Sequence, residues 1–564
     1  MFRETIIAIV SLLLISISDH GTVNIVILDE GCDNMKRILS LLLALCMIAS
    51  LLAACGGSSD PVQKNQAKAS DDKYRSFYQV WIGSFCDSNG DQTGDLPGLI
   101  SKLDYINDGD PNGGDDLGAD GIWLSPMMPS KSYHKYNVRD YFEIDPDFGT
   151  LEDFDKLIEE SHKRGIRVII DLVLNHSGDD HEFFVKACDE LREGKEDGYA
   201  RYYNVSKTSN DTYNRPISGS DYYYEGPFST DMPDWNLSYD GTREYFEKVT
   251  KFWLEKGVDG FRLDAVKYFD DKNTDADEFL NWFYTMAQKY NPDVYMVGED
   301  WDDAGNIYDM YESGIDSLFN FKFANSGGEF LVGSHNNVQD TMTKLQKYDN
   351  NIKKRNEKAI NANFLTNHDM VRLANMLDEE DYKMAANLYM LAPGNSFTYY
   401  GEEIGIEAPN TTNDASYRTA MIWDNENLPD IYVPGVAGVE KNELGGVEQQ
   451  LKDEHSILSA YRKLIKIRQQ NPEIARGNIS EVVNWGDTNC AGIIIEHDGS
   501  SVMVIHNVSD EAKEADVSEK FNNPELRGWS YGDKAAEPNK EIPKLSSGKL
   551  TIPAHTSVVL KNGK

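Results

Sequence analysis

Short apolar runs alternate with amphipathic segments from about Tyr74 onward. Strand-like runs separated by helical patterns are typical of βα units that build a parallel sheet. The sequence contains eight such runs, at Tyr78–Phe85, Gly121–Ser125, Arg167–Val173, Gly260–Ala265, Val294–Gly298, Ser317–Phe321, Asn363–Thr366 and Ser396–Tyr400. Eight units over roughly 400 residues predict an α/β fold, a (β/α)8 TIM barrel with insertions.

One helical pattern is clear enough to place at both ends, over residues 151–164. Thr150 is suited to cap its first turn, with Asp153 at the third helical position, and Gly165 ends it. The apolar residues that recur on one face are Phe154, Leu157 and Ile158. This period of 3.6 predicts a helix packed against the barrel.

Two stretches depart from the βα alternation. Residues 177–236, rich in Tyr, Asn, Ser and Asp, follow the third strand and predict an inserted domain, since long ordered loops are usually functional. They divide the barrel into residues 73–176 and 237–476. Short alternating runs then predict a C-terminal antiparallel β-sandwich over 477–564. These runs are Ala491–Glu496, Ser501–Asn507 and Lys549–Leu560.

The N-terminal part has the pattern of an export signal. Met35-Lys36-Arg37 precedes an apolar run from Ile38 to Leu51, and Leu52-Ala53-Ala54-Cys55 follows. The last quartet resembles a bacterial lipobox, in which Cys55 receives the lipid. An ordinary transmembrane anchor is the alternative, although the run is shorter than the roughly 20 residues of a span.

These features assign residues 1–54 to an upstream extension and a lipoprotein signal peptide. Residues 1–34 are then either upstream of the true start or removed with the signal. Residues 55–72, rich in Gly, Ser, Asp, Lys and Gln, predict a flexible tether. We therefore expect a protein that is lipid-anchored at the outer face of a bacterial cell membrane, or secreted.

The net charge and the cysteine content exclude several classes of ligand and of site. The formal net charge is −39, which argues against nucleic acid and against docking on anionic headgroups, so a lipid anchor would be the only membrane contact. The exported part holds Cys86, Cys188 and Cys490, whose spacing matches no zinc motif and cannot pair completely within one chain. We expect a monomer whose fold does not depend on disulfides.

Acidic residues follow three of the predicted strands. Asp264 ends the fourth, Glu299 the fifth and Asp369 the seventh. Reactive groups of barrel enzymes lie at the C-terminal ends of strands, so these acids should converge on one rim. A single acid there is more often a helix cap or a loop residue. Three together suit glycoside hydrolysis, which needs one carboxyl to protonate the leaving oxygen and another to attack the anomeric carbon.

Four segments resemble the shared regions of the α-amylase family, glycoside hydrolase family 13. They are Asp171–His176, Gly260–Asp264, Val297–Asp300 and Thr366–Asp369, and the resemblance extends from Tyr74 to about Trp423. It implies a retaining mechanism, with Asp264 as nucleophile, Glu299 as general acid and base, and Asp369 on the 2- and 3-hydroxyls of the strained sugar. A raised pKa is expected for Glu299, and carboxyl groups about 5–5.5 Å apart are expected for retention.

The same resemblance assigns the substrate-binding residues. Arg262 would orient Asp264 and keep it ionised, and Tyr136 would be the stacking platform at the cleaved sugar. Lys267 would reach the leaving-side sugar. The residues expected to contact sugar hydroxyls or to flank that subsite are His176, His368, Asp414 and Arg418. Structural hydrogen bonding is the alternative role for the histidines and Arg418.

A loop after the first strand has the spacing of a calcium site. Oxygen-bearing side chains alternate there at Asp87, Asn89, Asp91, Thr93 and Asp95. Hard oxygens on a tight loop suit Ca²⁺, although the loop is no EF-hand because Gln92 stands at its sixth position. Some family members have Gly where Gln92 stands. A plain polar turn is the alternative.

The resemblance also implies a second Ca²⁺ site, formed by Asn175, Asp234 and the carbonyl of Tyr268. It bears on specificity as well, since Met232–Asn236 and the insertion at 107–116 resemble a group intermediate between α-amylases and oligo-1,6-glucosidases. We expect endo-acting hydrolysis of starch and maltooligosaccharides. The alternatives are an exo-acting α-glucosidase or oligo-1,6-glucosidase, a cyclodextrin- or pullulan-degrading enzyme, and a non-catalytic glucan-binding protein.

Overall fold

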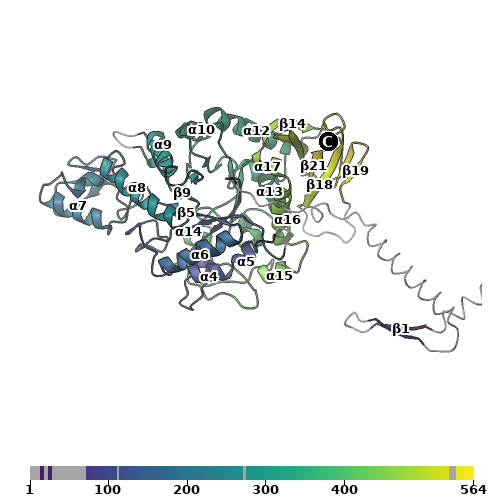
Figure 1. Ribbon diagram of the computed structural model, residues 1–564, viewed down its shortest axis with the longest axis horizontal. Coiled ribbons are helices and arrows are strands. Elements are labelled where there is room, and N and C mark those ends of the chain that lie inside the picture. Colours follow the sequence, from purple (N-terminus) through teal and green to yellow (C-terminus); the bar gives the residue numbers. More distant parts are fainter. Residues whose placement is uncertain are drawn as a thin grey trace, which may run out of the picture. The chain divides into compact units, whose positions relative to one another are not determined.

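Eight parallel strands form the central sheet of the computed structural model (Figure 1). In chain order they are β3 (Ser76–Val80), β4 (Gly121–Leu124), β5 (Arg167–Leu172), β9 (Gly260–Leu263), β10 (Tyr295–Gly298), β11 (Ser317–Leu318), β12 (Ala362–Phe364) and β13 (Asn395–Tyr399). Their spatial order is β11-β10-β9-β5-β4-β3-β13-β12. A parallel bridge between Phe319 and Ala362 joins the two outer strands. The predicted (β/α)8 barrel is therefore confirmed.

Alternation along the strands divides the apolar residues between two cores. One set fills the barrel and includes Phe77, Trp123, Ile169 and Val297. The residues that alternate with them, such as Ile122 and Ile170, pack outward against the surrounding helices. A filled interior is the usual state of an eight-stranded barrel, so only the rims are open to chemistry.

Helices surround the sheet on its outer side. The longer ones are α6 (Leu151–Lys163), α8 (Asp240–Glu255), α9 (Ala276–Ala287), α10 (Ala304–Met310), α12 (Val338–Arg355), α13 (Glu379–Met390) and α16 (Ile457–Gln470). The shorter ones are α3 (Ile82–Phe85), α4 (Leu96–Ser101), α5 (Leu103–Ile106), α11 (Glu329–Gly333), α14 (Asp414–Tyr417), α15 (Val447–Gln450) and α17 (Pro472–Arg476). Thr150 and Asp153 form a capping box at the start of α6, as predicted.

The first predicted strand is too long. It ends at Val80, and residues 82–85 form the short helix α3, with Ile82 and Phe85 fully buried. A continuous apolar run satisfies either a buried strand or a buried helix, so periodicity alone cannot separate them.

The segment between β5 and α8 contains its own secondary structure. It holds α7 (Glu182–Arg192) and a small sheet of β6 (Val205–Ser206), β8 (Tyr223–Glu225) and β7 (Tyr213–Pro216). Trp235 near its end is buried and stacks on Tyr203 with ring centroids 4.6 Å apart. This tryptophan therefore belongs to the packed interior and not to the exposed surface.

Two antiparallel sheets follow the barrel and pack face to face. The larger has the order β14 (Asn478–Asn484), β15 (Cys490–His497), β16 (Ser500–Asn507), β21 (Thr556–Asn562), β18 (Pro524–Tyr531). The smaller has the order β17 (Lys513–Asp516), β20 (Lys549–Ile552), β19 (Lys544–Ser546). The run predicted as one strand over 549–560 is two strands, because Pro553 interrupts it and His555 adopts a left-handed φ of 44°.

The larger sheet has two apolar faces. Ile493, Val502 and Val559 belong to the core that surrounds the barrel. Their neighbours Ile494, Met503 and Val558 belong to a second core beneath the smaller sheet. The period of two along each strand thus ties the C-terminal domain directly to the barrel.

The structure describes residues 13–17, 23–27, 72–110, 114–270, 275–532 and 542–563. The chain divides into two compact units, 1–60 and 61–564, and the first contains the antiparallel pair β1 (Leu13–Ile17) and β2 (Val23–Ile27). The predicted signal peptide, the lipidation site Cys55 and the tether up to residue 71 lie outside the described residues.

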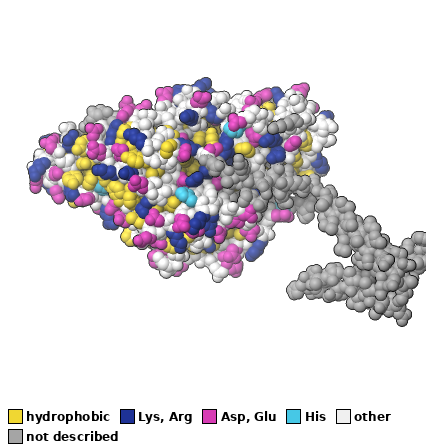
Figure 2. Space-filling view, in the orientation of Figure 1, with side chains coloured by type: hydrophobic (Ala, Val, Ile, Leu, Met, Phe, Trp, Pro, Cys, Tyr) yellow, Lys and Arg dark blue, Asp and Glu magenta, His cyan; other side chains and the backbone are white. Residues whose placement is uncertain are grey.

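Surface charge is mixed on the face that Figure 2 shows, where acidic and basic side chains are interspersed. Cys86, Cys188 and Cys490 are free thiols. Among the described helices, none combines the length and the apolarity needed to cross a bilayer.

Candidate active site

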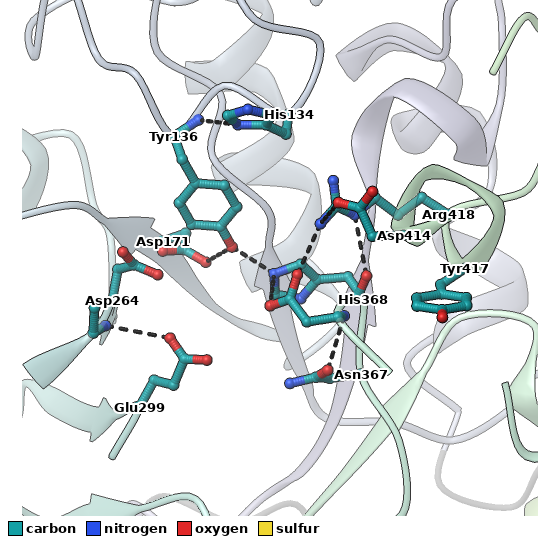
Figure 3. A network of polar contacts seen from close by, with 12 residues as sticks. His134, Tyr136, Asp171, Asp264, Glu299, Asn367, His368, Asp414, Tyr417 and Arg418 are labelled. Atoms are coloured by element: carbon teal, nitrogen blue, oxygen red, sulfur yellow. Dashed lines mark hydrogen bonds and ion pairs between the residues drawn. The ribbon is translucent and has the colours of Figure 1, made fainter. Parts of the chain in front are cut away.

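The three predicted catalytic acids lie at the C-terminal ends of barrel strands. Asp264 follows β9 and Glu299 follows β10 (Figure 3), and Asp369 follows β12. Leu263 pairs with Gly298 across β9 and β10, so the next residue of each strand, Asp264 or Glu299, emerges at the same level. The chain turns directly after the first acid, because Ala265 adopts a left-handed φ of 50°. The structure therefore brings the acids together on one rim.

Arg262 is the centre of this cluster. It is fully buried, and its Nη1 lies 2.7 Å from Asp264 Oδ1 while its Nη2 lies 2.7 Å from Glu299 Oε2. One guanidinium thus contacts both principal carboxyl groups and keeps them close. The separation expected for retention stays a prediction.

Burial sets the protonation of the two acids. Loss of solvent raises the pKa of Glu299 to about 7; Arg262 opposes this rise, and Asp264 adds to it. Burial also raises the pKa of Asp264, again against the effect of Arg262, to about 6. For Glu299, this upward shift is the one that a general acid needs near neutrality. The expected rise for Glu299 is present.

Asp171 belongs to the site, although no role was predicted for it from the sequence. It is fully buried in β5, and both of its carboxylate oxygens lie 2.9 Å from Arg262 Nη1. It also accepts hydrogen bonds from the Tyr136 hydroxyl at 3.2 Å and from Trp123 Nε1 at 3.3 Å. An acid within an otherwise apolar strand was the signal, since a buried carboxylate needs a cationic partner.

Tyr136 and His368 form the floor beside the acids. Their rings are stacked, 5.7 Å apart, and the Tyr136 hydroxyl lies 2.7 Å from His368 Nε2. The other ring nitrogen of His368 lies 2.8 Å from Gln79 Nε2, and its Nε2 also lies 3.0 Å from Asp369 Oδ2. Both nitrogens of His368 therefore have protein partners, and its role includes holding Asp369 and Tyr136.

Arg418 holds Asp369 from the other side. Its Nη2 lies 2.7 Å from Asp369 Oδ1 and 3.2 Å from Asp414 Oδ2. Its Nη1 donates to the Tyr133 hydroxyl at 2.6 Å, and its guanidinium lies over the Trp81 ring. Desolvation would raise the pKa of Asp369, but His368 and Arg418 lower it well below its usual range. Asp369 is therefore ionised at neutral pH.

The remaining predicted sugar contacts lie around the same rim. His176 is buried and its Nε2 has no hydrogen-bond partner, while burial lowers its pKa to about 3. This neutral ring can thus donate to a sugar hydroxyl. Lys267 is partly exposed, and its Nζ donates to the carbonyl of Trp301 at 2.8 Å.

The predicted calcium loop is folded as a series of tight turns. Asp87 accepts hydrogen bonds from the backbone N–H groups of Asn89, Gly90 and Gln92. Gln92 adopts a φ of 74°, the left-handed conformation that Gly favours at this turn. The departure from Gly therefore leaves the turn intact.

The loop's donor set fits a hard divalent cation. It offers the carboxylates of Asp87, Asp91 and Asp95, the amide oxygen of Asn89 and the oxygens of Thr93. Oxygen ligands of this kind are those that Ca²⁺ takes. These carboxylates already accept loop N–H groups, which holds them in one arrangement.

Two of the three residues predicted for a second cation are together. His176 and Asp234 form a backbone bridge, and Trp235 N donates to Asn175 O at 2.9 Å. Asp234 is buried with its Oδ1 unpartnered, a state that suits a cation ligand. Tyr268 is 42% exposed, and its ring contacts that of Phe228.

Another cluster of side chains, which was not predicted from the sequence, could also hold a metal. Ligand atoms of Glu380, Asp510 and His555 lie within 4.8 Å of one another. His555 Nε2 lies 3.2 Å from Glu380 Oε1 and 2.9 Å from Asp510 Oδ1. The arrangement is equally an ion-pair triad between the barrel helix α13 and the C-terminal domain.

Comparison with known proteins agrees with this geometry. The family model "Alpha amylase, catalytic domain" matches residues 79–477. Alpha-amylase 3 of Dictyoglomus thermophilum is 33% identical over 497 residues, covering 84% of this chain and 92% of that protein. Oligo-1,6-glucosidase of Bacillus cereus is 29% identical, with 71% and 84% covered.

Solved structures give the same result. Eubacterium rectale Amy13B has a TM-score of 0.81 and 38% identity, over 89% of this chain and 98% of that one. The alpha-amylase from H. orenii has a TM-score of 0.76 and 35% identity, over 87% and 100%.

Proposed function

The chain belongs to the α-amylase family of glycoside hydrolases, and on that basis we propose that it is a retaining endo-α-amylase. Its substrates would be the internal α-1,4-glucosidic bonds of starch and maltooligosaccharides. The observation that carries the proposal is the single buried guanidinium of Arg262 between Asp264 and Glu299. Such a pair of carboxyl groups, one protonated and one ionised, is what glycoside hydrolysis with retention needs.

In the first step, Asp264 attacks the anomeric carbon and the bond to the leaving oxygen breaks. Glu299 gives its proton to that oxygen, so the leaving chain departs as an alcohol and a β-glycosyl ester remains on Asp264. Arg262 stabilises the ionised form of Asp264 before the attack. The raised pKa of Glu299, caused by burial, keeps the proton available near neutrality.

In the second step, Glu299 acts as the base. It takes a proton from a water molecule, whose oxygen attacks the anomeric carbon and releases Asp264. Asp369, held ionised by Arg418 and His368, accepts hydrogen bonds from sugar hydroxyls in both transition states. The stacked Tyr136 supports the apolar face of the same sugar.

Exposed aromatic rings beside Glu299 support action on polymers. Trp301 is 44% exposed and stacks on Phe321, with ring centroids 4.9 Å apart. Phe228 and Tyr268 form a second exposed pair. Aromatic surface on the leaving side, near Lys267, suits several sugars beyond the cleaved bond. An enzyme that removes a terminal glucose from the non-reducing end needs less of such surface.

The similarity to Oligo-1,6-glucosidase of Bacillus cereus supports one alternative function. An exo-acting α-glucosidase or oligo-1,6-glucosidase would use the same acids. It would differ in releasing glucose alone from the chain end.

We also propose that Asp87, Asn89, Asp91, Thr93 and Asp95 hold Ca²⁺ in the loop after β3. Asn175 and Asp234 are the candidates for a second ion. Bound Ca²⁺ would neutralise the carboxylates of these loops and fix their fold. No step of the reaction passes through it.

Lipidation of Cys55 is the proposed route to the cell surface. It would place the enzyme where polymers too large for import are found. Labelling with a radioactive fatty acid should mark the wild-type chain in a bacterial membrane fraction. A Cys55→Ser variant that is labelled equally would refute the anchor.

The deciding experiment is product analysis with soluble starch. The exported part should give a ladder of maltooligosaccharides, and the Asp264→Asn variant should give none. Glucose as the sole product would favour the exo-acting alternative. Starch binding without any product would refute the hydrolase.

A further inference from the structure

A pocket of about 340 Å³ lies between the loop after β3 and the loop after β13. It is lined by Gln92, Thr419, residues 430–433 and residues 436–439. Gln92 lies in the loop after β3, and the other lining residues lie in the loop after β13. Loops that follow barrel strands share one face, so this pocket and the catalytic acids open to the same side. None of its lining residues has a role in the mechanism above.

Tyr432 is the prominent feature of this pocket. With 65% of its surface exposed, it is the most exposed of the large hydrophobic side chains that the structure describes. Its neighbours Ile431 and Val433 are buried, and they pack with Ala415 and Ala420 in a small apolar cluster. The two anchored neighbours hold the tyrosine outward.

The backbone of the pocket is held firmly at Tyr432. Its N–H donates to the carbonyl of Gln92 at 2.8 Å, and Gln92 Nε2 donates to Asp430 Oδ1 at 3.0 Å. An aromatic ring on a backbone held in this way, next to an exposed carboxylate, offers an apolar face and a hydrogen-bond acceptor together. That is the surface which a pyranose ring matches, with its C–H face and its peripheral hydroxyls.

Packed residues connect the wall of the pocket to the site on the side of Asp369. Gly435 adopts a φ of 76°, and a Cβ there would come within 2.9 Å of Asn413 Nδ2, next to Asp414. The same apolar cluster contacts Tyr133, whose hydroxyl accepts from Arg418. In Figure 3, Asp414 and Arg418 lie on the side of the network away from Glu299.

This position decides which part of a substrate could reach the pocket. Glu299 protonates the leaving oxygen, so the leaving chain lies on its side, near Trp301. Arg418 and Asp414 flank the sugar that becomes attached to Asp264. Sugars farther along that half of the chain, toward its non-reducing end, would pass Tyr133 and reach Tyr432.

We propose that the Tyr432 pocket is a remote subsite for glucose residues on the non-reducing side of the cleaved bond. The inference rests on the proposed action on α-glucans and adds to it a determinant of chain-length preference. The pocket shares Thr419 and Val439 with a larger one of about 820 Å³, so space for further sugars continues beyond it.

The test compares Tyr432→Ala with Tyr290→Ala, which removes another exposed tyrosine that contacts Glu247. KM and kcat are measured for maltooligosaccharides of increasing length and for 4-nitrophenyl maltoside. For Tyr432→Ala, KM should rise roughly five- to tenfold for the longest substrates and stay unchanged for the shortest, with kcat preserved. That rise is the loss of one stacked ring. Tyr290→Ala should match the wild type at every length.

Tyr432→Phe keeps the ring and should restore the wild-type KM for long substrates, and the unchanged KM of Tyr432→Ala for the shortest substrates excludes a mere loss of folding. Equal KM values for Tyr432→Ala and the wild type at all lengths would overturn the subsite while leaving the proposed hydrolase standing. A uniform rise at every length would overturn it too. A wild-type protein that cleaves no α-glucan would overturn both proposals.

Discussion

Replacing Asp171 with Asn should move the acid limb of the pH–rate profile to lower pH. The variant keeps the shape of the side chain and removes one negative charge from the surroundings of Arg262. Burial is the main cause of the raised pKa of Asp264, Arg262 opposes it, and the charge of Asp171 adds to it. Without that charge, Asp264 stays ionised, and therefore nucleophilic, in more acid solution.

The geometry sets the size of the effect. Asp171 Oδ1 and Asp264 Oδ1 lie 2.9 and 2.7 Å from the same nitrogen, Arg262 Nη1. The two oxygens are therefore no more than about 5.6 Å apart, and at an effective dielectric constant of about 20 their repulsion is about 3 kcal/mol. This corresponds to about two pKa units at the longest possible separation, and a shorter separation would give more. We expect a shift of about two units.

The assay is kcat/KM for 4-nitrophenyl maltoside between pH 3 and 9. Asp259→Asn is the matched control, because Asp259 lies at the opposite end of the barrel, directly before β9, and pairs with Arg167 at the start of β5 at 3.0 Å. Its profile should coincide with that of the wild type. An unchanged acid limb in Asp171→Asn, or one displaced upward, would refute the electrostatic reasoning, provided that thermal melting shows the variant folded.

Three further outcomes follow from the described contacts. Burial raises the pKa of Asp300 to about 6, so its folding contribution is full below pH 4 and is lost as the pH rises through 6. Asp300→Asn should therefore raise the melting temperature at pH 8 by the equivalent of about 2–3 kcal/mol, and an equal gain at pH 4 would contradict this. Thr150→Ala removes the capping box of α6 and should cost about 1 kcal/mol in urea unfolding; Thr150→Ser should cost far less. Chelation with EGTA should lower the melting temperature and added Ca²⁺ should restore it, whereas Asp87→Ala should respond less than the wild type, and a wild type indifferent to EGTA would argue for the plain polar turn.

Local patterns predicted the barrel because each strand carries its own signal. Asp264 and Glu299 come directly after apolar runs, and parallel strands bring such ends to one rim whatever their order in the chain. The capping pair Thr150 and Asp153 was equally visible, because a cap is a contact over three residues.

Features that depend on contacts between residues far apart in the chain could not be predicted from the sequence. Asp171 gains its meaning only from Arg262, which lies 91 positions away in the chain. The exposure of Tyr432 depends on how Ile431 and Val433 pack, and no period marks it. The break at Pro553 and His555 was obscured because both flanking runs alternate in the same way. Long-range contacts, rather than composition, decide such cases.

The two-faced sheet of the C-terminal domain has a consequence for evolution and for engineering. Ile493 and Val502 complete the core around the barrel, while Ile494 and Met503 build the other core. The barrel thus ends and the sheets begin near residue 477, but the two parts share one apolar core and should unfold together. Truncation there would uncover an apolar face on each fragment and promote aggregation. Exchange of this module would therefore need a replacement sheet with a matching apolar inner face.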